Sequence, residues 1–283
     1  TDICKEFPGV KALDHVSLTV KKGTVHALMG ENGAGKSTLM KCLFGIYAKN
    51  AGTIVLDGKE VDFKSSKEAL ENGVAMVHQE LNQALTRSVM DNLWLGRYPK
   101  VAGLMVSESV MRKRTREIFE ELDVHVDPKA IMSTLPVSQR QMVEIAKAVS
   151  LDAKLIIMDE PTSSLGKEEI EQLMETVRGL KAKGVAILFV SHKLEELFEL
   201  CDRVTVMRDG EHIITEDTVN LTEDSLINAM VGRTLDNLYP KEFGTKGEVW
   251  LEAKGLNEAG VLHDVSFKAH AGQITGFAGL VGA

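Results

Sequence analysis

Short apolar runs alternate with longer segments of helical periodicity along most of the chain. The runs of strand length are residues 25–29, 74–77, 155–158, 185–190 and 204–207. Helical patterns occupy residues 36–45, 168–180 and 194–200 between them. Strands that alternate with helices in this way predict an α/β domain built on a largely parallel sheet.

Two other regions depart from this alternation. Near the start, residues 16–20 and 53–56 alternate apolar and polar positions with period two, which predicts an antiparallel β subdomain. Residues 84–150 instead predict successive helices at 89–95, 107–122 and 139–149, with Pro128 and Pro136 between them. We interpret this stretch as a helical insertion within the α/β domain.

The last fifty residues contain a linker pattern and an internal repeat. Residues 233–247 carry Pro240, Gly244 and Gly247 among charges, and they predict a linker. Residues 13–34 and 262–283 align without a gap, sharing a leucine, a Val-Ser pair, three glycines and a final alanine. Coincidence between two amphipathic segments is one interpretation; a tandem duplication is the one we favour. We therefore expect a first domain at 1–232 and the truncated start of a second at 248–283, in a chain that is a fragment.

Composition and charge exclude several classes of protein. The 283 residues carry 33 Lys and Arg against 41 Asp and Glu, a net charge of −8, which argues against a nucleic-acid binder that relies on a basic surface. The three cysteines, Cys4, Cys42 and Cys201, form no Cys-x-x-Cys pair, so a disulfide framework or structural zinc site is not expected. No apolar run approaches the ~20 residues of a membrane span. Any link to a membrane is therefore expected to come through a partner.

A phosphate-binding motif follows the first apolar run. The pattern GxxxxGK[ST] is matched by Gly30, Glu31, Asn32, Gly33, Ala34, Gly35, Lys36, Ser37 and Thr38. Glycines allow backbone N–H groups to surround a phosphate, and the start of the following helix adds its dipole. Lys36 is expected to reach the β- and γ-phosphates and Ser37 to ligate Mg²⁺. The alternative is a glycine-rich turn without a ligand.

Polar residues also follow three of the other predicted strands. Asp159 and Glu160 end the run at 155–158, and in a parallel sheet we expect this strand to lie beside the phosphate loop. Asp159 would then hold the Mg²⁺ shell and Glu160 would polarise a water as general base. Gln79 and His192 follow two further strands and could point into the same crevice. Solvated loop residues are the alternative in each case.

The order of these motifs resembles the nucleotide-binding domain of ABC transporters. The set is the phosphate loop, Gln79, a Leu-Pro-Val-Ser-Gln segment at 135–139, Asp159-Glu160, and His192. Residues 10–13, 26–33, 41–47, 76–82 and 87–99 further resemble the ATP-binding subunits of bacterial monosaccharide importers, most of all the galactose/methyl-galactoside type. In that family two such domains lie in tandem on one polypeptide.

The resemblance implies roles for individual residues. Phe7 matches the aromatic residue that stacks on adenine, although a core phenylalanine at a strand end is an alternative. Gln79 matches a residue that touches Mg²⁺ and the attacking water, and His192 matches the histidine that contacts the γ-phosphate. The helical insertion matches the subdomain that receives the permease's coupling helices.

Two positions depart from the family pattern. The signature, which acts on the nucleotide of a facing domain, normally opens Leu-Ser, and here Pro136 replaces that serine. We expect a helix from about Ser138, with Ser138 capping it and offering a hydroxyl, followed by Gln139. Many ABC domains also place an aspartate where this chain has Gly166.

The resemblance implies an ATPase that uses ATP and Mg²⁺ to energise sugar import. Its expected partners are an integral-membrane permease, a periplasmic or extracellular sugar-binding protein, and a second ABC domain in cis or in trans, with no nucleic acid. It would be peripheral, at the cytoplasmic face of the bacterial inner membrane. Alternatives are import of ribose or another monosaccharide, a soluble tandem ABC ATPase acting on ribosomes or DNA, and an ordinary P-loop kinase.

Overall fold

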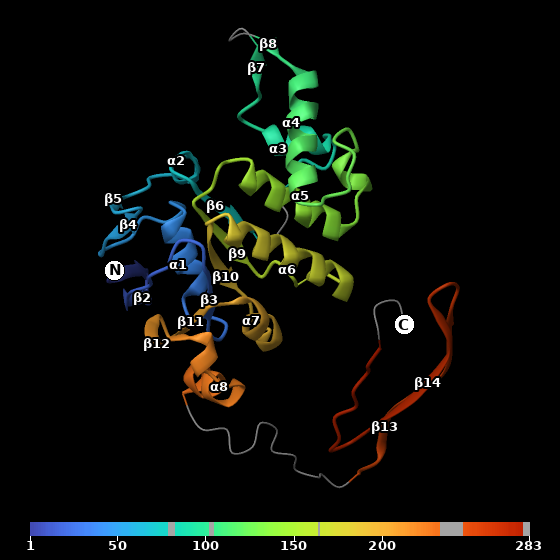
Figure 1. Ribbon diagram of the computed structural model, residues 1–283. Helices are drawn as coiled ribbons and strands as arrows, with labels where there is room; N and C mark the ends of the chain where they lie inside the picture. Colours follow the sequence, from blue (N-terminus) through green and yellow to red (C-terminus); the bar gives the residue numbers. More distant parts are fainter. Residues whose placement is uncertain (79–82, 102–104, 164, 233–245, 280–283) are drawn as a thin grey trace. The chain divides into compact units, whose positions relative to one another are not determined.

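A six-stranded sheet organises the larger part of the chain (Figure 1). The computed structural model describes residues 1–78, 83–101, 105–163, 165–232 and 246–279, and it divides the chain into two units, Thr1–Arg233 and Thr234–Ala283. In the first unit the strand order is β12-β11-β3-β10-β9-β6. The strands are β3 (Val25–Met29), β6 (Val74–Val77), β9 (Leu155–Asp159), β10 (Ala186–Val190), β11 (Arg203–Arg208) and β12 (Glu211–Asp217).

All neighbouring pairs in this sheet are parallel except β11 with β12. Every residue of β3, β6 and β10 is buried, as parallel sheets covered on both faces require. The α/β fold with a largely parallel sheet is therefore confirmed.

Helices cover the sheet on both faces and create two cores. Alternate side chains of β3 divide between them: Val25, Ala27 and Met29 join the larger core, and Leu28 joins the smaller one. The smaller core is completed by α1 (Lys36–Leu43), α2 (Ser66–Glu71) and the strand β2 (Val10–Val16). The larger core is completed by α3 (Val89–Trp94), α4 (Glu108–Glu121), α5 (Val137–Val149), α6 (Lys167–Ala182), α7 (Leu194–Leu200) and α8 (Glu223–Val231).

Two antiparallel pairs lie near the start of the chain, as predicted. They are β1 (Ile3–Phe7) with β2, and β4 (Ile54–Leu56) with β5 (Lys59–Val61). The predicted extent of one strand is wrong, because β2 ends at Val16, where the prediction began. Leu18 and Val20 pack against the smaller core without belonging to a strand. Their apolar character therefore reflects partial burial against this core and not strand pairing.

The stretch predicted to be helical holds α3, α4 and α5, drawn in green in Figure 1. The indole N–H of Trp94 donates to the Thr115 hydroxyl at 2.9 Å, which ties α3 to α4 in the core. Sequence reasoning missed a short antiparallel pair in this stretch, β7 (Lys100–Val101) with β8 (Met105–Val106). Two residues per strand are too few to show a hydrophobic period.

In the part of the second unit that the structure describes, β13 (Val249–Glu258) pairs antiparallel with β14 (Leu262–His270). Both units therefore contain a pair of antiparallel strands that holds one copy of the repeat, but the pairing differs: Val16 lies opposite Ile3, and its repeat counterpart Val265 lies opposite Leu256. That the second unit starts a second nucleotide-binding domain remains a prediction. Among the described residues, the helices are all too short or too polar to span a bilayer.

Candidate functional site

The glycine-rich loop joins β3 to α1, and its glycines have positive φ angles, which favour glycine. Gly35 has φ 97° and forms the N-cap of α1. A Cβ there would lie 2.7 Å from the Ala12 carbonyl oxygen and 3.0 Å from a Leu13 methyl carbon. At Gly33, where φ is 88°, a Cβ would meet nothing within 4 Å. The loop therefore packs tightly against β2 at Gly35 and stands clear of the protein at Gly33.

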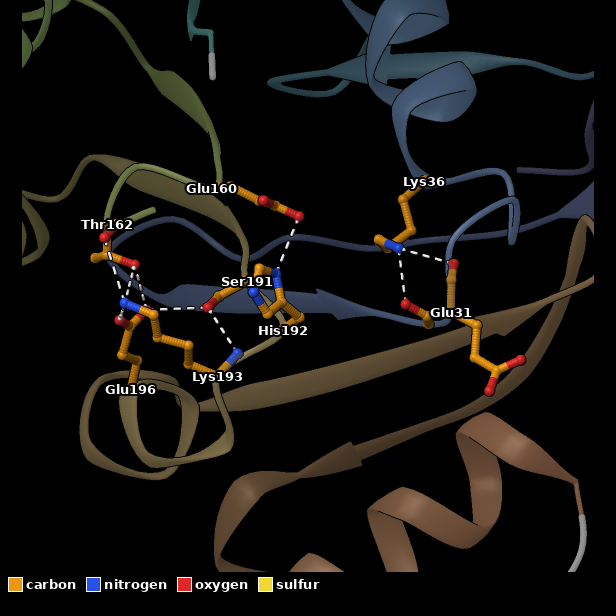
Figure 2. Close-up of polar contacts among 9 residues, drawn as sticks. Glu31, Lys36, Glu160, Thr162, Ser191, His192, Lys193 and Glu196 are labelled. Carbon is orange, nitrogen blue, oxygen red and sulfur yellow. Dashed lines mark hydrogen bonds and ion pairs between the residues drawn. The ribbon is translucent and has the colours of Figure 1, made fainter. Parts of the chain in front are cut away.

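Lys36 folds back across this loop. Its ammonium donates to the carbonyl oxygen of Gly30 at 2.7 Å and to that of Glu31 at 3.0 Å (Figure 2). Burial lowers its pKa, while the carboxylates of Glu160 and Asp159 act in the opposite direction. The cation at the start of α1 thus shares an electrostatic environment with the acidic end of β9.

The carboxylates lie at the carboxyl end of β9. Burial, and then the neighbouring charge of Glu160, raise the pKa of Asp159. Glu160 adopts φ 47°, and its N–H donates to the Val190 carbonyl oxygen at 2.9 Å. Two adjacent carboxylates at a partly buried strand end favour a cation, and oxygen ligands are those that Mg²⁺ prefers.

His192 contacts Glu160 from the next strand. Its Nδ1 lies 3.1 Å from Glu160 Oε1, and Figure 2 shows the two side chains pointing toward each other. The expectation that the strand ending in Asp159 lies directly beside the phosphate loop is wrong, because β10 lies between β3 and β9. Sequence order does not fix strand order, and the crossover brings the His192 loop between the lysine and the carboxylates.

The remaining predicted residues are distributed around this centre. Ser37 and Thr38 lie in the first turn of α1, and Asn32 and Ala34 lie in the loop before it. Gln79 lies outside the described residues. Phe7, at the end of β1, is 37% exposed, so the alternative of a core phenylalanine is wrong. Its ring meets the Tyr47 ring edge-on, with centroids 5.3 Å apart, and this aromatic partner was missed.

The signature segment begins α5, but its capping differs from the expectation. The helix starts at Val137 with Pro136 as N-cap, at φ −60° and ψ 159°, and without a side-chain cap. Ser138 therefore lies inside the first turn, and the prediction that it caps the helix is wrong. Interaction with the Ser138 side chain, and then the Gly166 N–H that donates at 2.7 Å, lower the pKa of the Glu169 carboxylate. Gln139 follows Ser138 in the same turn.

The model of the ABC transporter family matches residues 13–163. The galactose/methyl galactoside import ATP-binding protein MglA of Escherichia coli (strain K12) is 57% identical over 283 residues, covering 99% of this chain and 56% of the relative. Its counterpart from Yersinia pestis is 56% identical over 285 residues, covering 100% and 56%. The chain thus spans about half the length of these curated relatives.

Solved structures show the same fold. A nucleotide-free ATP-binding cassette from an ABC transporter superposes with a TM-score of 0.71 at 26% identity, covering 83% of this chain and 95% of that one. The ADP conformation of another ABC-transporter cassette gives a TM-score of 0.69 at 27% identity, covering 81% and 92%. The first unit of this chain therefore has the fold of an ATP-binding cassette, and its own strand ends carry Lys36, Asp159, Glu160 and His192.

Proposed function

The chain belongs to the ABC transporter family, and from that premise we propose that it binds and hydrolyses ATP to energise sugar import. The single observation that supports this most strongly is the meeting of three strand ends. The glycine loop with Lys36, the Asp159-Glu160 pair and His192 follow β3, β9 and β10, which lie side by side. Such an arrangement can hold a triphosphate and place a base beside its terminal phosphate.

Binding would begin at the loop. Backbone N–H groups of residues 30–38 and the start of α1 face the phosphates, and the Lys36 ammonium exchanges two carbonyl partners for phosphate oxygens. Phe7 would stack on the adenine, with Tyr47 supporting its ring. Exposure of Phe7 is consistent with that role, since a buried ring could not meet a base.

Hydrolysis would depend on Glu160 and His192. The Glu160 carboxylate accepts a proton from the attacking water, and His192, already 3.1 Å away, orients the carboxylate and contacts the γ-phosphate. Ser37, Asp159 and Gln79 would hold Mg²⁺, which supplies positive charge to the β- and γ-phosphates. Ser138 and Gln139 would act on the nucleotide of a facing ABC domain, so turnover by this chain alone requires pairing.

A groove next to the helical region offers a place for the membrane partner. Its volume is about 540 Å³, and it is lined by residues of α2, β6 and α5 and by residues that directly follow α1 and α3. Apolar residues such as Leu70 and Leu95 line it together with the charged Glu144 and Lys147. We propose that a coupling helix of the permease docks there. This would hold the chain at the cytoplasmic face of the bacterial inner membrane, with the sugar-binding protein on the other side.

Reconstitution tests the function and its alternatives. The chain, in its full-length protein with its permease and binding protein in proteoliposomes, should import radiolabelled galactose or methyl galactoside only when ATP is present. Import of ribose in preference to galactose would reassign the sugar. Co-purification with ribosomes in place of a membrane protein would contradict transport, and phosphate transfer to an acceptor in place of water would indicate a kinase.

A further inference from the structure

A buried carboxylate lies on the helix that follows His192, and none of the roles proposed above involves it. Glu196 sits in α7, and only 6% of its surface is exposed. The residue before it, Glu195, is exposed on the same helix. A glutamate on the apolar side of a helix is costly to bury unless its oxygens are used, so its partners indicate its role.

Those partners come from the two loops that carry the catalytic pair. Glu196 Oε2 accepts a hydrogen bond from the Thr162 hydroxyl at 2.9 Å and another from the Ser191 hydroxyl at 2.9 Å (Figure 2). Both hydroxyl residues are themselves buried. One carboxylate oxygen therefore joins the loop after β9 to the end of β10.

Lys193 closes the network. Its ammonium lies 3.0 Å from Glu196 Oε1 and donates to the Thr162 carbonyl oxygen at 3.3 Å. Its backbone N–H donates to the Ser191 hydroxyl at 3.1 Å. The charge of the buried carboxylate is thus compensated by a lysine from the same loop as Ser191, which leaves the four side chains fixed as a unit.

The network lies just beyond the last bond between β9 and β10, which the Glu160 N–H donates to the Val190 carbonyl oxygen. Pairing of β9 with β10 ends at Asp159 opposite Val190. Thr162 follows Glu160 by two residues, and Ser191 directly precedes His192. Glu160 also keeps a backbone conformation at positive φ, which persists only when surrounding contacts determine it. The Thr162 and Ser191 hydroxyls meet on Glu196 just beyond the last paired residues.

We propose that Glu196 is a positioning residue that fixes Glu160 and His192 at hydrogen-bond distance by joining the two loops that carry them. Its contribution to catalysis rests on the proposed ATPase function, but its effect on the Glu160–His192 contact does not. Misplacing a catalytic group by about 1 Å can cost about 100-fold in rate, so loss of the network should reduce turnover by roughly 10- to 100-fold.

The variant Glu196→Leu removes both acceptor oxygens at similar volume, whereas Glu196→Gln keeps one acceptor oxygen. Glu195→Gln is the matched surface control. Should Glu196→Leu fail to fold, Thr162→Val removes one link of the network at almost unchanged shape. Trp94, which is 7% exposed, reports whether each variant keeps the folded core.

Side-chain NMR of ¹³C-labelled histidine tests positioning without any turnover. The His192 signal is identified as the one absent from His192→Asn. Replacing Glu160 by Gln should shift the His192 imidazole resonances in the wild-type background, in Glu195→Gln and in Glu196→Gln, and leave them unshifted in Glu196→Leu. An equal shift in the Glu196→Leu background would overturn the proposal.

Turnover tests the catalytic consequence. Glu196→Leu should lower ATP turnover 10- to 100-fold with ATP affinity within about twofold of wild type, and Glu196→Gln should recover most of it. Combining Glu196→Leu with Glu160→Gln should be no slower than Glu160→Gln alone, because both act on one group. Multiplying effects, or parallel loss of ATP affinity, would contradict positioning. Unchanged turnover in Glu160→Gln itself would refute the proposed ATPase role of Glu160, and the NMR result would still decide the role of Glu196.

Discussion

Two glycines of the same loop should tolerate a methyl group very differently. Gly35→Ala and Gly33→Ala introduce the same Cβ at φ 97° and 88°. In both variants the alanine must adopt a left-handed backbone conformation, which costs about 1–2 kcal/mol of folding free energy. At Gly33 nothing further is met within 4 Å, but at Gly35 the new carbon lies 2.7 Å from the Ala12 carbonyl oxygen.

That close approach sets the size of the difference. A clash with backbone cannot be relieved by rotating a side chain, and inserting an extra carbon into a packed site costs about 1–3 kcal/mol. We therefore expect the free energy of unfolding to fall by about 1–2 kcal/mol in Gly33→Ala and by about 2–5 kcal/mol in Gly35→Ala. The two variants should differ by about 1–3 kcal/mol.

Urea unfolding followed by tryptophan fluorescence measures this difference. Trp94 is 7% exposed in the first unit, whereas Trp250, the second of the two tryptophans, is 82% exposed and should report little. The midpoints at unchanged slope give the free energies. If Gly33→Ala is as destabilising as Gly35→Ala, the tight packing of the loop against β2 is not what requires glycine at Gly35.

Three further changes probe the binding loop, the signature and the core. Lys36→Ala removes a charged hydrogen-bond donor to phosphate, and such a bond contributes about 1.5–3 kcal/mol to binding. ATP affinity measured by calorimetry should therefore fall roughly 10- to 100-fold. An unchanged affinity would refute the phosphate-loop assignment. Pro136→Ser adds a side-chain N-cap to α5, which stabilises the helix by about 1 kcal/mol, but it also raises the entropy of the unfolded chain, which destabilises the fold by about 0.4–1 kcal/mol, so the melting temperature should hardly change. Turnover in the full-length protein with its permease should rise at constant ATP affinity. Unchanged turnover would mean that this segment does not contact nucleotide. Burial, and then the charge of Arg203, lower the pKa of His26 from 6.5 to about 4. As the pH falls from 6.5 toward 4, the imidazole therefore becomes protonated in the unfolded chain and stays neutral in the folded one. Stability should therefore drop by about 2 kcal/mol from this group between pH 7 and pH 5, and urea unfolding of His26→Gln should lack that share of the drop; an identical pH dependence would contradict it.

Local signals made much of the fold predictable. The strands β3, β6, β9, β10 and β11 are apolar runs long enough to be recognised, and the glycine loop between β3 and α1 carries its own motif. Such features depend on neighbours within a few residues. The extent of β2 was misjudged because Leu18 and Val20 are partly buried without strand pairing, which the pattern of apolar positions does not distinguish.

Features that depend on distant contacts could not be predicted in the same way. The position of β10 between β3 and β9 follows from how the chain crosses over, and the interaction by which the Ser138 side chain lowers the pKa of Glu169 is between residues of two different helices. The Glu196 network links residues up to 34 positions apart. One signal for it was present, since Glu196 lies beside Leu197 and four residues before Leu200, both buried, on the apolar side of α7.

The central claim is that Glu160 is the general base of a site that a facing domain completes. The most direct test measures phosphate release from ATP by the wild-type chain and by Glu160→Gln over a range of protein concentrations. The turnover per wild-type chain should be low when dilute and rise with concentration, as chains pair. Glu160→Gln should bind ATP with unchanged affinity and turn over at least about tenfold more slowly at every concentration. Equal rates for the two chains, or a high wild-type rate independent of concentration, would contradict it.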